Sequence, residues 1–318
     1  MFGRTLRNGL FATAAAGTLS IGLGISPAAA ALLPFDIDPD ALTTTGGPFA
    51  NVTATDLNGV SNALIQQIAA TTQLETGWLK VTGLTNNGSS VPNGSSRLIP
   101  EGDIGTPGTN VYGLYALFNG IVNGITGFSP GSTGSIGAGD YTFVLKGDIG
   151  DESTFTTGSK SASGGTAPTV VDVGGNDVVL AVGSSLSGSV GFAPVSGAPF
   201  FNVLASFIVC NGTAGQGLRG STLVTGGDAA SCGTFAGANY FVSPSPFYQL
   251  DFNSSISGSA SNLDVFTGAL DPGAAPNATL NGIVADINFQ VPEPMTLSLV
   301  GFGLLGIGAI SRRRRRAA

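Results

Sequence analysis

The stretch IVADINFQ at residues 283–290 alternates apolar and polar side chains along most of its length. A period of two predicts a β-strand with one face in a core and one face in water, the usual pattern of antiparallel sheets. The stretch YQLDFN at residues 248–253 follows the same scheme. In YTFVLK at residues 141–146, Tyr141, Phe143 and Leu145 share one face. All three stretches therefore predict antiparallel strands.

Further strands are predicted from the residue types that favour them. Residues 78–81 and 111–118 are rich in β-branched and aromatic side chains. Residues 170–182 and 200–209 are nearly continuous apolar runs, which predict strands covered on both faces. Residues 61–71 fit a helix face or a strand equally well. Residues 153–168 are Ser/Gly-rich and predict a loop that is the one candidate domain boundary.

Eight or more short strands separated by turns predict an all-β fold, an antiparallel β-sandwich of jelly-roll-like type. The composition agrees, because 50 glycines and only 10% charged residues do not suit helical bundles.

The N-terminus has the features of a secretory signal peptide. Arg4 and Arg7 precede an apolar stretch at residues 9–25, and a Pro-Ala-Ala-Ala-Ala run follows at residues 27–31. Basic, apolar and small-residue regions in this order predict a signal peptide at residues 1–30 and export of the body at residues 31–290.

The C-terminus at residues 291–318 has three parts. Pro292, Glu293 and Pro294 come first, and residues 295–310 then form an apolar run without charge. As a helix this run would be about 24 Å long, which predicts a single transmembrane helix. Five consecutive cations close the tail and hold it on the cytoplasmic side of the membrane. They are Arg312, Arg313, Arg314, Arg315 and Arg316.

This three-part tail resembles the PEP-CTERM sorting signal of Gram-negative bacteria. The resemblance implies a membrane-embedded exosortase as a partner, which removes the tail and releases or re-anchors the body. The expected route therefore runs through an inner-membrane intermediate to the cell surface or the extracellular space.

Several short sequence motifs in the body resemble those of the flocculation-associated family of PEP-CTERM proteins. They are FDIDP at 35–39, GPF at 47–49, ETGWL at 75–79, YGLY at 112–115 and FVSPSPFY at 241–248. The resemblance implies an extracellular matrix protein that works with exopolysaccharide in flocs and biofilms. It supplies no catalytic residue.

Charge and chemistry exclude several function classes. Without its two ends, the body at residues 31–290 has five basic residues against 18 carboxylates, a formal charge of −13. Such a surface repels nucleic acid. The absence of histidine excludes Ser-His-Asp and Cys-His catalysis, so we expect no enzyme and no catalytic residue. Cys210 and Cys232 are the only cysteines and predict one disulfide in an exported chain.

Two acidic segments are calcium candidates, and no other cofactor is expected. Calcium prefers six to eight oxygen ligands, which clustered carboxylates and turn carbonyls can supply. The segments are Asp36, Asp38 and Asp40, and Asp148, Asp151 and Glu152.

An alternative function is a carbohydrate-binding surface module without a role in building a matrix. Such a module would present an exposed row of aromatic rings. The candidates are Trp78, Tyr112, Tyr115, Tyr240 and Tyr248.

Overall fold

The computed structural model describes residues 33–42, 49–92, 96–98, 111–234, 240–244 and 252–289. The chain divides into a unit of Met1–Ala30 and a unit of Ala31–Ala318, and the second holds every described residue. The predicted signal peptide and C-terminal helix lie outside the described residues. Within the described ranges, no helix has the length and apolar character needed to cross a membrane.

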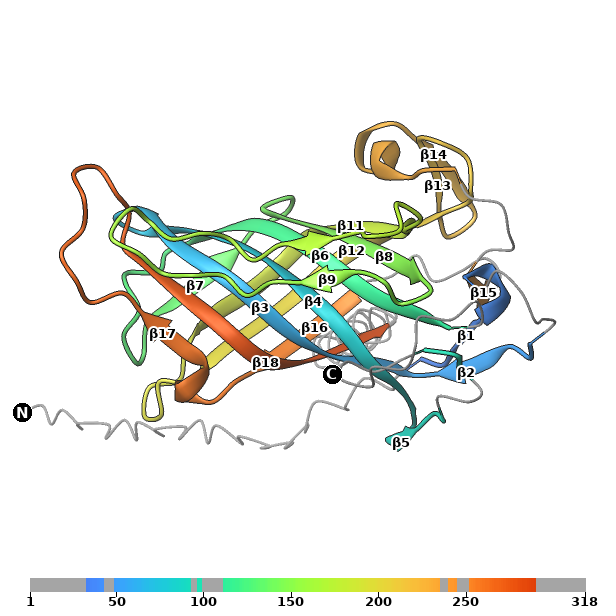
Figure 1. Cartoon of the computed structure of the whole chain (residues 1–318), viewed down its shortest axis with the longest axis horizontal. Coiled ribbons are helices and arrows are strands. Elements are labelled where there is room, and N and C mark those ends of the chain that lie inside the picture. The colour runs from blue at the N-terminus through green and yellow to red at the C-terminus, as the bar shows by residue number, and fades with distance from the viewer. Residues whose placement is uncertain are drawn as a thin grey trace, which may run out of the picture. The chain divides into compact units, whose positions relative to one another are not determined.

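Eight strands form the body of the fold, and their arrangement can be followed in Figure 1. They are β3 (Asp56–Ala69), β4 (Thr72–Asn86), β6 (Tyr112–Asn123), β8 (Tyr141–Ile149), β11 (Val178–Phe192), β12 (Pro199–Cys210), β16 (Phe252–Ser257) and β18 (Asn277–Phe289). Every pairing among them is antiparallel, in the order β12-β16-β18-β3-β4-β6-β8-β11. Because β11 also pairs with β12, the sheet closes on itself.

The predicted all-β antiparallel class is confirmed, but the strand order differs from a jelly roll. A jelly roll packs two separate sheets face to face. Here β8 and β11 pair with each other, and they also pair with β6 and β12, respectively. One continuous sheet results in place of two. Closure removes the free edges of these strands, and unpaired edges invite aggregation.

The remaining elements are short strands and 3-10 helices. Three strands form a small separate sheet, β1 (Phe35–Ile37), β2 (Val52–Ala54) and β15 (Phe241–Ser243). Two others pair with each other, β9 (Thr154–Phe155) and β10 (Val170–Val171). The remaining strands are β5 (Ser89–Ser90), β7 (Thr133–Ile136), β13 (Gln216–Arg219), β14 (Thr222–Thr225) and β17 (Leu263–Val265). The 3-10 helices are η1 (Pro39–Ala41), η2 (Gly227–Ser231) and η3 (Ala260–Asn262).

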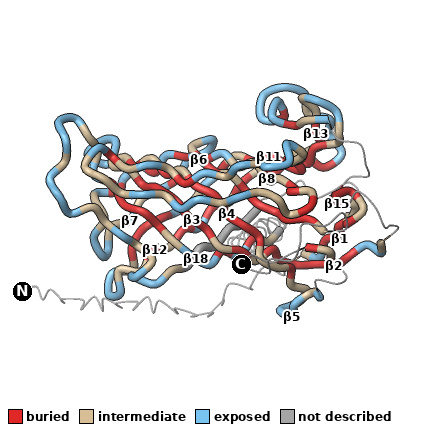
Figure 2. The backbone as a smooth tube through the Cα atoms, in the orientation of Figure 1, coloured by how far each residue is buried: buried red, intermediate tan, exposed pale blue. Residues whose placement is uncertain are grey.

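The alternation predicted at residues 283–290 is confirmed in β18. Ile283, Ala285 and Ile287 are at most 1% exposed, whereas Val284 between them is 55% exposed. In Figure 2, buried residues lie along the strands, and long exposed stretches lie mainly at the connecting loops. The strand also begins at Asn277, six residues before the alternating stretch.

Three sequence expectations need correction or completion. Residues 170–182 do not form one strand, because the carboxylate of Asp172 accepts N–H bonds from Gly175, Asn176 and Asp177 and turns the chain before β11. Residues 61–71, left open between helix and strand, belong largely to β3. Along β12, coverage of both faces is confined to its end at residues 207–210.

The Ser/Gly-rich tract at residues 153–168, here called the outer strap, packs against the outer face of the sheet and is not a domain boundary. Phe155 stacks edge-on against Trp78 and Tyr115, with ring centroids 5.0 and 5.5 Å away. The indole N–H of Trp78 donates to the carbonyl of Thr156 at 2.8 Å. Phe155 therefore anchors the start of the strap, and contacts such as the hydrogen bond from the Gln66 side-chain amide to the carbonyl of Gly164 at 2.8 Å hold its later part.

Candidate functional site

The sorting tail follows directly on the last strand of the closed sheet. β18 pairs with β3 up to Asn288, which lies opposite Asp56, and with β16 at Phe289. The predicted sorting residues Pro292–Pro294 and the arginine block Arg312–Arg316 lie outside the described residues. In the sequence, only two residues separate Phe289, where β18 ends, from Pro292.

The N-terminal side of the body begins at the same end of the sheet. Phe35 in β1 pairs with Ala54, only two residues from Asp56, where β18 ends. The chain therefore enters the described body and leaves it at neighbouring positions. Sequence reasoning could not find this proximity, because it depends on strand register.

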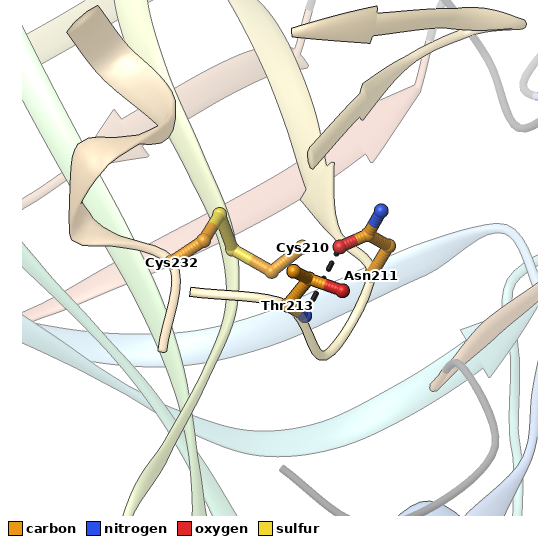
Figure 3. The surroundings of a disulfide bond; sticks show 4 residues. All are labelled: Cys210, Asn211, Thr213 and Cys232. Atoms are coloured by element: carbon orange, nitrogen blue, oxygen red, sulfur yellow. Dashed lines mark hydrogen bonds between the residues drawn. A yellow bond between two sulfur atoms is a disulfide. The ribbon is translucent and has the colours of Figure 1, made fainter. Parts of the chain in front are cut away.

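The predicted disulfide is confirmed between Cys210 at the end of β12 and Cys232 after η2 (Figure 3). Both sulfurs are in a small buried cluster with Val182, Ile208 and Ala229. Beside it, the N–H of Thr213 donates to the Asn211 side chain at 3.1 Å. The bond fastens the β13–β14 hairpin and η2 to the end of the closed sheet.

The acidic segment near β1 makes hydrogen bonds within the protein. Asp36 accepts from the Thr53 hydroxyl at 2.5 Å. Asp38 accepts from the N–H of Asp40 at 3.0 Å and caps η1. Asp40 accepts from the N–H of Phe49 at 3.0 and 3.1 Å. The three carboxylates thus hold local turns together.

The second acidic segment also makes contacts within the protein. Both carboxylate oxygens of Asp148 accept backbone N–H bonds, from Glu152 at 3.0 Å and Ser153 at 2.8 Å. Asp151 lies 3.8 Å from the ammonium of Lys80, and burial raises its carboxyl pKa. Across the described ranges, no three His, Cys, Asp or Glu side chains gather as metal ligands. Calcium binding at either segment stays a prediction.

An ionic cluster on the outer face was missed by sequence reasoning. Asp177 accepts from the Tyr115 hydroxyl, with the Lys146 ammonium at 3.9 Å. Burial is the main cause that raises the carboxyl pKa of Asp177, and Asp148 adds to it by repulsion. Asp177 is distant in sequence from both partners, so no local pattern indicates the cluster.

A buried carboxyl inside the closed sheet was missed as well. Glu75 is 4% exposed and accepts a hydrogen bond from the hydroxyl of Tyr141, which has no exposed surface. Burial raises the pKa of Glu75 to about 7, although the bond from Tyr141 opposes the shift. Glu75 shares its strand face with buried Gln73 and Leu79, and this period of two was the available signal.

The aromatic candidates for a sugar platform are core residues. Trp78, Tyr112, Tyr115 and Tyr240 are at most 2% exposed. Tyr112 and Tyr240 also share a hydrogen bond between their hydroxyls at 3.1 Å. Tyr248 lies outside the described residues. None of the four described rings can stack on an external sugar.

Comparison with known proteins identifies the tail. Residues 290–316 match the family model of the PEP-CTERM protein-sorting motif. The motif indicates a protein that is exported, processed by an exosortase and delivered by way of the membrane to the cell surface or the exterior. No curated protein and no solved structure matches the chain.

Proposed function

We propose that this chain, which carries a PEP-CTERM protein-sorting motif, is a structural protein of the extracellular matrix of a Gram-negative bacterium. In this role it holds cells in flocs and biofilms together with secreted polysaccharide, and it catalyses no reaction. The observation that carries the proposal is the motif at residues 290–316, which directs the body out of the cell.

The body has properties that suit such a role. Its eight long strands close into one sheet, and a disulfide fastens the hairpin at one end. Asp148 accepts a backbone hydrogen bond that stabilises a turn, and Asp151 forms an ion pair with Lys80. These features favour a durable extracellular building block. The sequence motifs that resemble flocculation-associated proteins support the proposed partnership with polysaccharide.

Deletion of the protein in its host tests the function. We expect the deletion strain to lose flocculation and the full-length protein to restore it. A version without residues 292–318 should not restore it, because sorting is lost. Its body should still fold, since the last described strand ends at Phe289.

Circular dichroism and thermal melting of the shortened protein provide the control for folding. Normal flocculation of the deletion strain would contradict the matrix role. Full rescue by the shortened protein would show that sorting is not what links the protein to flocculation.

The alternative is a carbohydrate-binding module without a matrix role. Its four described aromatic candidates are buried in the core and cannot contact a sugar. If the deletion strain flocculates normally while the purified protein binds sugar, this alternative is the better account.

A further inference from the structure

A groove lies between β2 and the hairpin of β4 and β5. Its lining comes from residues 49–53 on one wall and from Asn86 and residues 89–92 on the other. At its base, the N–H of Thr55 donates to the carbonyl of Thr85 at 2.7 Å. Beyond that bond, β2 turns toward β1 and the hairpin continues, so the two walls separate (Figure 1).

The lining of the groove is uncharged and mixes polar with apolar side chains. None of the ten lining residues is charged, although the chain carries 19 carboxylates. Asn51, Ser89 and Ser90 are exposed, and Asn86 is half-buried. Amides and hydroxyls offer donors and acceptors together, which matches the hydroxyl groups of a neutral sugar.

One aromatic ring in the lining is held in place from two sides. The backbone N–H of Phe49 donates to the Asp40 carboxylate, and the guanidinium of Arg97 stacks 4.3 Å from the ring centroid. The Phe49 side chain is half-buried. A fixed ring provides apolar contact for the C–H groups of a sugar at little entropic cost.

We propose that this groove binds a chain of neutral sugar units. The inference rests on the proposed function and deepens it, because it gives the polysaccharide partner a binding site. It also replaces the predicted platform of Trp78 and the tyrosines with a site that combines amides and hydroxyls with one aromatic ring.

Titration of the processed protein from the cell surface with neutral gluco-, galacto- and manno-oligosaccharides tests the proposal. Binding is followed by calorimetry. We expect at least one series to bind, and Asn51→Ala and Asn86→Ala each to weaken it about tenfold, which corresponds to the loss of about one good hydrogen bond. Asn202→Ala, at an exposed position on β12, is the matched control and should bind like the natural protein.

Failure of every neutral series to bind would overturn the proposal. Equal binding by the groove variants and the natural protein would overturn it too, because the site would lie elsewhere. Thermal melting shows whether each variant is folded, and Ser90→Ala supplies a further groove variant if one is not.

A peptide probe tests whether the groove binds a peptide instead of a sugar. β2 pairs only with β1 among the described strands, so an extended peptide could add to its second edge. If an uncharged Thr-Val-Thr-Val-Thr peptide binds and is weakened by the groove variants while sugars are not bound, the groove is a peptide site and the proposal is wrong. Loss of flocculation on deletion, together with absent sugar binding, would refute the groove site and leave the matrix role standing.

Discussion

At the scale of single residues, Glu75 links pH to the stability of the whole body. Its carboxyl has a pKa of about 7 in the folded protein against 4.5 for the ordinary group. Between these two values the folded state keeps a proton that the unfolded chain has lost. Stability therefore falls as pH rises from about 4.5 to about 7 and changes no further above that from this group.

Glu75→Gln should remove this pH dependence. The natural protein is expected to lose about 3 kcal/mol of unfolding free energy between pH 4.5 and pH 7.5, at 1.36 kcal/mol per pKa unit. The variant keeps an oxygen for the Tyr141 hydroxyl but cannot ionise, so its stability should change much less. Urea unfolding at several pH values measures the difference.

Asp271→Asn, at an exposed loop position, is the matched control and should retain the natural pH dependence. Parallel pH curves for the natural protein and Glu75→Gln would show that Glu75 does not carry the effect.

Sequence reasoning predicted a strand at residues 78–81, which does not include Glu75. The observed β4 begins at Thr72, and both of its faces are covered around Glu75 and Trp78. Trp78 on the outer face is covered by the outer strap, and Glu75 on the inner face meets Tyr141 from β8. The strap and β8 are remote in the chain, so residue types near Glu75 do not report them.

At the scale of elements, Phe155 anchors the start of the outer strap. Phe155→Ala removes the contacts with Trp78 and Tyr115 and uncovers the ammonium of Lys80, which lies 4.8 Å from the Phe155 centroid. We expect a loss of about 2 kcal/mol of stability from apolar burial and ring stacking.

Trp78 is the only tryptophan in the chain, so its fluorescence reports directly on the strap. Emission should shift to longer wavelength in Phe155→Ala, because water reaches the indole. Val171→Ala, at a 52% exposed position on the neighbouring β10, should leave both fluorescence and stability nearly unchanged. Unshifted emission in Phe155→Ala would mean that the strap stays in place without the ring.

The disulfide fastens a second element. Cys210 and Cys232 close a loop with a sequence separation of 22 residues. Replacing both by alanine should cost about 3 kcal/mol, because the unfolded chain regains the freedom that the cross-link removes. Thermal melting of the double variant measures the loss, and an unchanged melting temperature would contradict a stabilising role for the bond.

Local patterns predicted most of the eight strands of the closed sheet but not their exact extent, and they missed short strands such as β1 and β2. Alternation located β18, where one face is buried and the other exposed, and it located β8, although Phe143 and Val144 on its opposite faces are both half-buried. The prediction of one strand from the apolar run at residues 170–182 was wrong, because the turn that Asp172 organises interrupts the run. Residues 153–168 were predicted only as a loop, since a single Phe155 in a polar tract carries no periodicity.

At the scale of the whole molecule, closure of the sheet was beyond sequence reasoning. Periodicity describes one strand at a time, whereas closure depends on whether β11 meets β12 and β6 meets β8. The groove at residues 49–53 and 86–92 was equally hidden, because its two walls come from separate segments of the chain. The sorting tail was predictable because its three parts follow each other in sequence and need no tertiary contact.

The central claim is that the tail is a sorting signal that is removed on the way to the cell surface. Intact mass spectrometry of the protein recovered from the cell surface tests it most directly, with a variant in which Pro292, Glu293 and Pro294 are all alanine as the comparison. The account predicts that the natural surface protein lacks Arg312–Arg316, and that the alanine variant keeps them and stays in the membrane fraction. Natural surface protein that still carries the arginine block, or an alanine variant shortened like the natural one, would contradict it.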